Sequence, residues 1–190
     1  MKLSDFDFKL PNELIALRPA DPRSSSKLLV SSGDEIIDDH FLNLIKYLKR
    51  GDRLVLNDTK VIPAKLSGQR IRYSDNGKTS ANIGVNLLSM IKEGHWLALA
   101  KPAKRVNVGE TIHFGKDLNA LVLEKSPDGL LLKFNMSEEN FEKKLETLGK
   151  MPLPPYIASQ RLPDELDDND YQTVFAKHSG SVAAPTASLH

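Results

Sequence analysis

Six short strand-like segments between residues 63 and 136 constrain the fold more than any other feature of the chain. Turn signals separate most of them, for example Asp75-Asn76-Gly77 and Pro127-Asp128-Gly129. Six short strands at this spacing favour closure, because a closed sheet leaves no exposed edge. We therefore predict a six-stranded antiparallel β-barrel, inserted into a mixed α/β domain.

The expected insert comprises residues 63–149, because a helix with one apolar face and a following glycine continues the barrel segment. Pro63 marks its start, since proline cannot donate a hydrogen bond to a central strand. Residues 1–62 and 150–190 would then be two parts of one partial α/β domain.

Several shorter elements are expected outside the barrel. Residues 27–40 are typical of a β-hairpin, and 41–48 carry apolar side chains at the i, i+3, i+4 and i+7 spacing of a helix. Residues 4–10 alternate as a strand would, and 54–56 form a short apolar strand. Residues 11–16 begin with the proline that a first helical turn tolerates.

Two later segments are less regular. Residues 163–170 carry five acids in eight positions and predict a mobile surface loop. Residues 171–176 fit a helix or a strand equally well. Small residues surround Pro185-Thr186 near the end of the sequence, as in a loop that leads into a first helical turn.

Composition limits the function classes. The chain has 26 Lys+Arg against 25 Asp+Glu, so its net charge of +1 gives no general attraction to nucleic acid, and any RNA contact needs a local patch. Cysteine is absent, which excludes disulfides and thiolate zinc sites and is typical of a reducing cytosol. The five histidines lack metal-ligand spacing, and no apolar run is long enough to span a membrane. We expect a cytoplasmic protein without metal.

Four polar residues, Asn57-Asp58-Thr59-Lys60, follow the apolar run 54–56. Ligand contacts in α/β proteins gather at the ends of buried strands, so this position suggests a site, with Asp58 as an acid, a base or the partner of a cation. The alternative is a simple turn, because Asn and Asp side chains cap their own backbone well. The sequence leaves both interpretations open.

A cationic cluster lies on the widest loop of the predicted barrel. Lys101, Lys104 and Arg105 fall within five residues, and Arg70 belongs to the basic segment before them. This spacing suggests contacts with nucleic-acid phosphates, although such loops are more often only solvated. Trp96 could stack on a base, but a single tryptophan in a strand is more often a core residue.

Several longer sequence segments resemble those of a known protein family. FDFKLPNELIALRPADPRSSSKLLV, GDRLVLNDTKVIPAKLSGQR, WLALAKPAKRVNVGETIHFG, MPLPPYI, YQTVFA and GSVAAPTASLH are similar, in this order, to the S-adenosylmethionine:tRNA ribosyltransferase-isomerases of queuosine biosynthesis. The resemblance implies an α/β domain with an inserted six-stranded barrel. It also implies that the ribosyl group of S-adenosylmethionine moves to an aminomethyl-deazaguanine at the tRNA wobble position. Isomerisation would give epoxyqueuosine and release adenine and methionine.

The same resemblance implies roles for particular residues. Asp58 would face the sulfonium, and His190 would transfer protons. The donor substrate would also contact Asn57, Thr59, Lys60, Pro185 and Thr186, and tRNA would contact Lys101, Lys104, Arg105 and Arg70.

The partners implied are S-adenosylmethionine and a tRNA that carries the queuosine precursor. The family's proteins are also expected to continue for about as long again, so a C-terminal half is a further expected partner and the chain by itself is expected to be inactive. A non-catalytic RNA-binding β-barrel protein, or a remnant of the enzyme, is the alternative.

Overall fold

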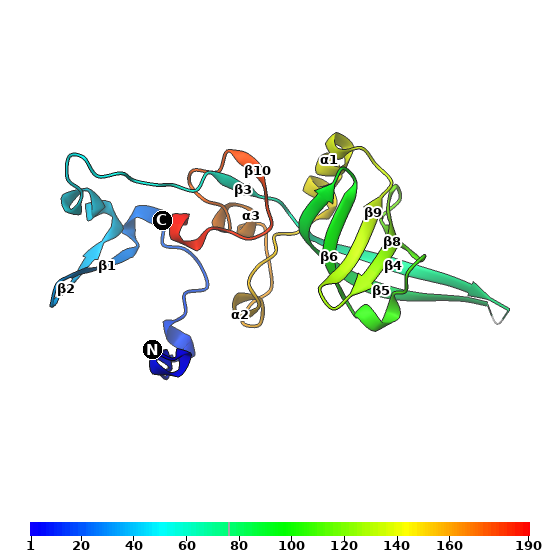
Figure 1. The fold of residues 1–190 in the computed structure, drawn as a ribbon, viewed down its shortest axis with the longest axis horizontal. Helices are drawn as coiled ribbons and strands as arrows, with labels where there is room; N and C mark the ends of the chain where they lie inside the picture. Colours follow the sequence, from blue (N-terminus) through cyan, green and yellow to red (C-terminus); the bar gives the residue numbers. More distant parts are fainter. Residues whose placement is uncertain (76) are drawn as a thin grey trace.

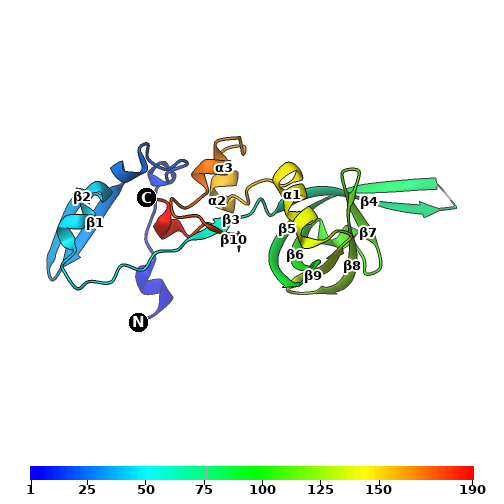
Figure 2. The same ribbon diagram turned by 90° about the horizontal axis from the view of Figure 1, so that it is seen from above.

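The computed structural model describes residues 1–75 and 77–190 as an elongated molecule (Figure 1). A β-barrel lies at one end and a two-stranded hairpin lies at the other. Between them lies a central part built from a short parallel strand pair and two one-turn helices, and Figure 2 shows the same order from above.

The barrel is closed and wholly antiparallel, with the strand order β4-β5-β6-β9-β8-β7. The predicted six-stranded barrel is therefore confirmed. Its strands are β4 (Lys65–Ser74), β5 (Gly77–Lys92), β6 (His95–Lys101), β7 (Thr111–Phe114), β8 (Leu118–Ser126) and β9 (Gly129–Phe134).

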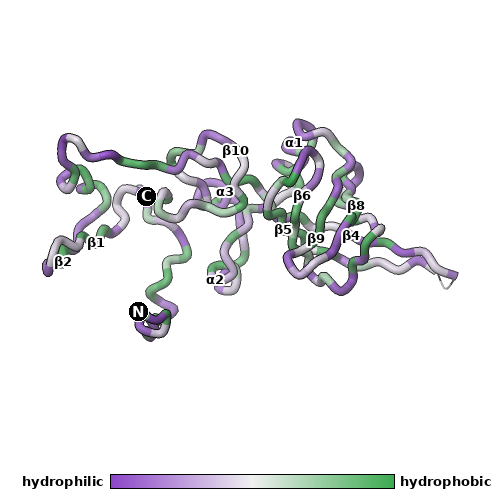
Figure 3. Tube along the Cα trace, viewed as in Figure 1, coloured by the Kyte–Doolittle hydropathy of each residue, from purple (hydrophilic) through white to green (hydrophobic). Residues whose placement is uncertain are grey.

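Alternation along each strand places the apolar side chains inside the barrel. On β4, Leu66 and Gly68 face inward while Ser67 and Gln69 face solvent. Figure 3 shows the corresponding change between hydrophobic and hydrophilic positions along the strands. Buried Leu, Ile, Val, Ala and Phe residues from all six strands form one core, which is the main source of stability expected for this region.

The predicted helix after the barrel strands is α1 (Glu138–Leu148), and it covers one end of the barrel. Its buried Phe141 lies 4.4 Å from the Phe134 ring and 5.8 Å from Trp96, measured between ring centroids. Trp96 is thus a core residue. Gly149 ends the helix where an added Cβ would lie 2.1 Å from the Pro63 carbonyl oxygen, so only glycine fits this close approach.

The central part joins segments that are far apart in the sequence. Strand β3 (Thr59–Val61) pairs in parallel with β10 (His178–Ser181), and α2 (Pro155–Ala158) and α3 (Asp167–Asp170) lie beside them. A small core of Val61, Met151, Tyr171 and Ala184 holds this part together. Residues 171–176, left open between helix and strand, form turns.

The acidic segment is not the free loop that the sequence predicts. Arg18 donates to Asp170 at 2.8 Å and to Asp167 at 3.2 Å, and it also bonds Asp164. Arg161 donates to Asp167 at 2.9 Å through one nitrogen and bonds it through a second. The Arg161 bond lowers the pKa of Asp167, and the Asp170 bond raises the pKa of Arg18. Two arginines therefore fix three of the five acids, Asp164, Asp167 and Asp170, in a segment that the sequence predicted to be mobile.

The far end contains the predicted hairpin, formed by β1 (Lys27–Ser32) and β2 (Glu35–His40). The helix expected after it is a 3-10 helix, η4 (Phe41–Tyr47), rather than an α-helix. Asp39 anchors it, because its carboxylate accepts hydrogen bonds from Asn43 Nδ2 and the Tyr47 hydroxyl, both at 2.7 Å.

Three predicted elements of this region are wrong. Residues 4–10 and 11–16 contain only single 3-10 turns, and residues 54–56 are extended but form no strand. A strand needs a partner for its backbone, and no described segment pairs with 54–56. The 3-10 turns of the chain outside η4 are η1 (Leu3–Phe6), η2 (Asn12–Leu14), η3 (Arg23–Ser25), η5 (Ala103–Arg105) and η6 (Thr186–Ser188).

Candidate functional site

A groove of about 460 Å³ opens in the central part, and we call it the central groove. It is lined by residues 16–20, 26–27, 153–154, 156–157, 161, 170–171, 186 and 189–190. Its side chains combine apolar and aromatic surface with a few polar groups, a mixture typical of small-molecule sites. Its polar and aromatic lining includes Arg18, Tyr156, Tyr171, Thr186 and His190.

Arg23 fixes one wall of the central groove. Its guanidinium donates to the carbonyl oxygens of Asn169, Gln172 and Leu189, and thereby ties the N-terminal segment to the last residues of the sequence. The Gln172 side chain in turn bonds both backbone groups of Val61 on β3, at 2.7 and 3.1 Å. The groove and β3 are therefore parts of one hydrogen-bonded unit.

Thr186 and His190, predicted from the sequence, do line the same groove. Thr186 begins η6, where the Ser188 N–H donates to the Pro185 carbonyl at 2.8 Å. The His190 ring stacks on Phe41, with centroids 5.4 Å apart and planes 30° apart. A short turn and an aromatic contact thus set the position of these two polar side chains.

Asp58 lies outside the central groove. Its exposed carboxylate is 3.5 Å from His178 Nε2, and its carbonyl oxygen accepts hydrogen bonds from the N–H groups of Lys177 and His178 at 2.7 and 3.1 Å. The structure shows no contact between Asp58 and His190 among the described residues. The histidine that accompanies Asp58 is therefore His178, which sequence reasoning did not select.

The neighbours of Asp58 have distinct positions. The Asn57 Oδ1 accepts a hydrogen bond from the Thr59 N–H at 2.9 Å, so the turn interpretation of this stretch holds at least for Asn57. Lys60 borders a smaller hollow of about 250 Å³ between β3 and α1, together with Gln172. None of the three lines the central groove.

The cationic loop lies on the barrel. Lys101, Lys104 and Arg105 are all exposed, and η5 presents the last two. Arg70 is different, because only 5% of its surface is exposed and its Nε donates to the Arg105 carbonyl at 3.0 Å. The predicted direct contact between Arg70 and tRNA does not fit this burial. Arg70 instead holds the loop that carries the other cations.

Other residues of the site had no clear signal in the sequence. Arg18, Arg23 and Arg161 act through pairings with residues about 150 positions away or with a local acid. The only hint was a segment with many acids, which needs cations somewhere to neutralise it. Within residues 1–75 and 77–190, no group of three or more His, Asp or Glu side chains could hold a metal ion. No helix in that part of the chain is long and apolar enough to cross a membrane.

Comparison with known proteins places the chain in a family. The family profile described as "Queuosine biosynthesis protein" matches residues 3–190. Proteins named S-adenosylmethionine:tRNA ribosyltransferase-isomerase are similar to it, with 57% identity in Ruegeria pomeroyi and 52% in Cereibacter sphaeroides. Both alignments cover 100% of this chain and 54% of the relative, so the chain spans about half the length of the curated relatives it matches.

A solved structure is also similar. The crystal structure of S-adenosylmethionine tRNA ribosyltransferase from Thermotoga maritima is 34% identical, and the match covers 83% of this chain and 53% of that chain with a TM-score of 0.36. From the family match over residues 3–190, the chain belongs to the queuosine biosynthesis protein family.

Proposed function

We propose that the chain supplies part of an S-adenosylmethionine:tRNA ribosyltransferase-isomerase, and that the central groove holds the donor substrate. The observation that carries the proposal is the meeting of Thr186 and His190 with Tyr156 and Tyr171 in one groove. The names of its relatives support the same activity. The groove is of a size found for small-molecule sites, which span about 300–1,000 Å³.

The groove offers suitable groups for an adenosyl substrate. Its tyrosine rings and apolar walls suit a purine, and the Thr186 hydroxyl suits a ribose hydroxyl. Arg18 is already paired with Asp164, Asp167 and Asp170, so we assign it the positioning of the wall rather than a contact with substrate.

The reaction needs a proton acceptor beside the sulfonium, a neutral attacking amine, and the departure of adenine and methionine. We propose that His190 moves protons, because an imidazole can act as acid and base near neutral pH. Asp58 lies outside the central groove, so we do not assign it to the sulfonium of a donor held there. Asn57, Thr59 and Lys60 lie outside the groove as well, whereas Pro185 would shape the turn that carries Thr186.

We propose that tRNA phosphates contact Lys101, Lys104 and Arg105. These side chains are exposed together on one loop, which gives a local positive patch on a nearly neutral protein. The Lys125 ammonium stiffens the loop by donating to the Ala103 and Val106 carbonyls at 2.8 and 2.7 Å. A fixed loop loses less conformational freedom on binding.

Protein-detected NMR with S-adenosylmethionine tests the proposal, because it detects weak as well as tight binding. We expect shifts at the amides of the central groove, and about fivefold weaker binding for Thr186→Val, which removes one neutral hydrogen bond at nearly constant shape. Thr79→Val, at an exposed position on β5 of the barrel, is the matched control and should bind like the wild type. Absence of shifts in the groove, or equal binding by Thr186→Val, would contradict the assignment and favour the RNA-binding alternative.

Turnover is a separate test. We expect no adenine release from this chain with S-adenosylmethionine and precursor tRNA, because the relatives that carry the name are about twice as long. Chromatography of the reaction mixture would measure adenine. Its appearance over multiple turnovers would place the whole catalytic machinery within these 190 residues.

A further inference from the structure

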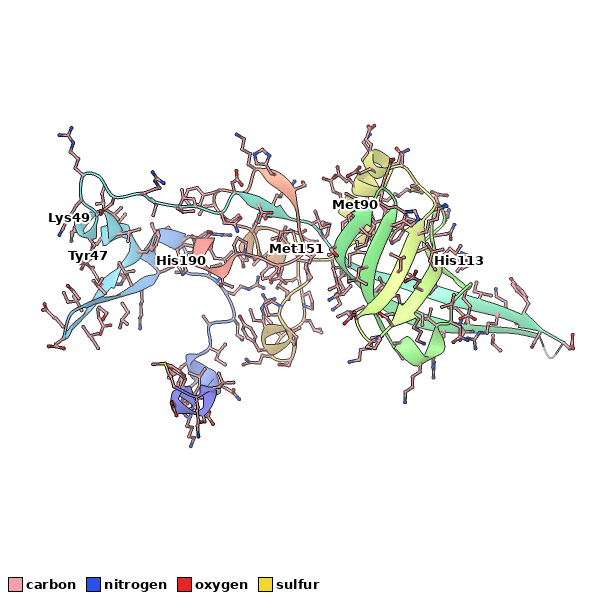
Figure 4. All side chains as sticks on the ribbon, in the orientation of Figure 1. Tyr47, Lys49, Met90, His113, Met151 and His190 are labelled. Atoms are coloured by element: carbon pink, nitrogen blue, oxygen red, sulfur yellow. The ribbon has the colours of Figure 1, made fainter. Side chains whose placement is uncertain are left out.

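A second hollow, of about 830 Å³, lies on the outer face of the barrel. We call it the barrel groove and define it by Ser67, Gln69, Asn82, Gly84, Lys101 and His113. Figure 4 labels His113 on the barrel and His190 in the other part of the molecule, so this groove is separate from the central groove. Its polar side chains have no part in the function proposed above, except for Lys101.

Strand register brings amide and imidazole groups into one row across the barrel. Asn82 on β5 lies opposite Gln69 on β4, and Gln69 lies opposite His113 on β7. Gln69 Nε2 donates to Asn82 Oδ1 at 3.2 Å, and His113 Nδ1 donates to Asn119 Oδ1 at 2.6 Å. Neighbouring strands are about 4.8 Å apart, so the three side chains span roughly 10 Å.

Small residues leave the floor beside this row open. Ser67 and Gly84 lie opposite each other, two residues along β4 and β5 from Gln69 and Asn82 and on the same face. A Cβ at Gly84 would meet only the Lys101 carbonyl, at 3.6 Å, which is an ordinary contact. At the inward-facing Gly68, by contrast, a Cβ would lie 2.7 Å from the Phe114 ring. Packing therefore requires glycine at 68 but not at 84, where its effect is to keep the groove empty.

The charge of the barrel groove selects the class of ligand. Lys101 lies opposite Gly84 at the rim, and the lining contains no carboxylate among the residues that the structure describes. Amide side chains hydrogen-bond to the edges of nucleobases, and a lysine attracts a phosphate. Proteins read RNA sequence mainly on unpaired bases, whose edges and faces are accessible.

We propose that the barrel groove binds unpaired bases of an RNA loop, with Gln69 and Asn82 contacting base edges and Lys101 contacting the adjacent phosphate. The inference rests on the proposed function, since a tRNA is the partner that would bring such a loop. It adds recognition of bases to the contacts with phosphates assigned to Lys104 and Arg105. It makes the barrel a determinant of which RNA is bound.

The test compares two RNA hairpins with the same stem. One carries a tRNA anticodon-loop sequence, and the other carries abasic ribose units in the loop, which keep the phosphates and remove the bases. We expect the 190-residue chain to bind the base-bearing hairpin at least about tenfold more tightly, as the loss of one or two base contacts predicts. Equal binding of the two hairpins would overturn the inference.

The most direct test of the barrel groove is a variant that fills it with a larger side chain. Gly84→Val should abolish the preference for the base-bearing loop while the barrel stays folded, because the site accepts a side chain and valine favours strands. Ser80→Val, exposed on the same strand but outside the groove, is the matched control and should keep the preference. An unchanged preference in Gly84→Val, with a circular dichroism melt like that of the wild type, would overturn the inference.

Two double variants separate bases from phosphates. Gln69→Ala with Asn82→Ala should remove most of the loop preference, whereas Asn140→Ala, an exposed amide on α1, should not. Lys104→Ala with Arg105→Ala should flatten the slope of log affinity against log salt by up to about two units but keep the preference. The inference would be overturned if Lys104→Ala with Arg105→Ala abolished the preference for the base-bearing hairpin while Gln69→Ala with Asn82→Ala kept it. Donor binding, measured separately by NMR, reports on the proposed function.

Discussion

The barrel and residues 1–62 contain similar apolar patterns but use them in opposite ways. Leu132 in the barrel is 0% exposed, whereas Val55 in the extended segment is 83% exposed. In Figure 3 the apolar stretch before β3 runs along a connection rather than into a core. A closed sheet supplies every strand with two neighbours, while 54–56 has none among the described residues. Periodicity thus shows that a segment can be buried, but not what buries it.

The largest expected effect comes from separating the two regions. We predict that residues 63–149, expressed alone, show β-type circular dichroism and a cooperative melt, because their core is complete within them. Residues 1–62 alone should show no cooperative transition. The domain boundaries remain a prediction until this experiment is done, and an unfolded spectrum from 63–149 would contradict them.

A shorter barrel fragment sharpens this comparison. Residues 63–136 lack α1, so the rings of Trp96 and Phe134 lose their contacts with Phe141. We expect this fragment to melt at a lower temperature than 63–149. Equal melting temperatures would show that α1 contributes nothing to the barrel core.

Single truncations should differ between the regions by several kcal/mol. Leu132→Ala should lower the free energy of unfolding by about 2–5 kcal/mol, because it removes buried methyl groups and leaves a cavity. Val55→Ala, at an exposed position, should change it by less than about 0.5 kcal/mol. Urea unfolding monitored by Trp96 fluorescence would measure the change at Leu132, and amide exchange in residues 1–62 would measure the change at Val55. A similar cost at the two positions would contradict the contrast in burial.

The central part should respond to the loss of one charge. Asp167→Asn keeps the shape of the side chain but weakens its bonds to Arg18 and Arg161. A hydrogen bond with a charged partner contributes about 1.5–3 kcal/mol, so amide exchange in the central part should accelerate about tenfold or more. Asp128→Asn in a barrel turn is the control. Unchanged exchange would show that the network is not a structural tie.

Short sequence patterns predicted the elements of the fold that are formed by neighbouring segments of the chain. The barrel strands, the hairpin at Gly33 and α1 carry their own turn and cap signals, and most strands pair with a neighbour in the sequence; β4–β7 and β6–β9 are the longer-range pairings that close the barrel. The pairing of β3 with β10 joins segments more than 100 residues apart, and no periodicity encodes such a contact. The same limit explains why the sequence suggested a mobile acidic loop, since Arg18 lies far from it.

The site was predictable only in part, for the same reason. Thr186 and His190 lie four residues apart in the sequence, so the sequence could place them together, and the structure puts both in the central groove. Asp58 was grouped with them by the chemistry that the resemblance implied, but its near neighbour is His178. Arg70 was counted as a surface cation because charge alone does not reveal burial.

The smallest expected effect concerns Asp39, which joins the β1–β2 hairpin to η4. Hydrogen bonds from the Tyr47 hydroxyl, then from Asn43 and the His40 N–H, lower the pKa of Asp39 from 3.8 to about 2. Because the folded-state pKa of Asp39 is depressed, its ionised carboxylate stabilises the junction between the hairpin and η4 fully above pH 3.8. This stabilisation is lost as the pH falls through about 2. The barrel has no part in this linkage, so its melt should not follow the same titration.

Carboxyl-carbon NMR would measure this titration directly. Tyr47→Phe removes the bond with the largest effect, so the pKa of Asp39 should rise towards 3.8 while the hairpin stays paired. Tyr73→Phe, at an exposed position on β4 of the barrel, should leave that pKa unchanged. A wild-type midpoint near 3.8, or equal midpoints in the two variants, would show that the Asp39–Tyr47 bond does not hold η4 in solution. Among the side-chain bonds of the described residues, the far end of the molecule would then keep only that of Asn43 between Asp39 and η4, and its contrast with the barrel would be greater still.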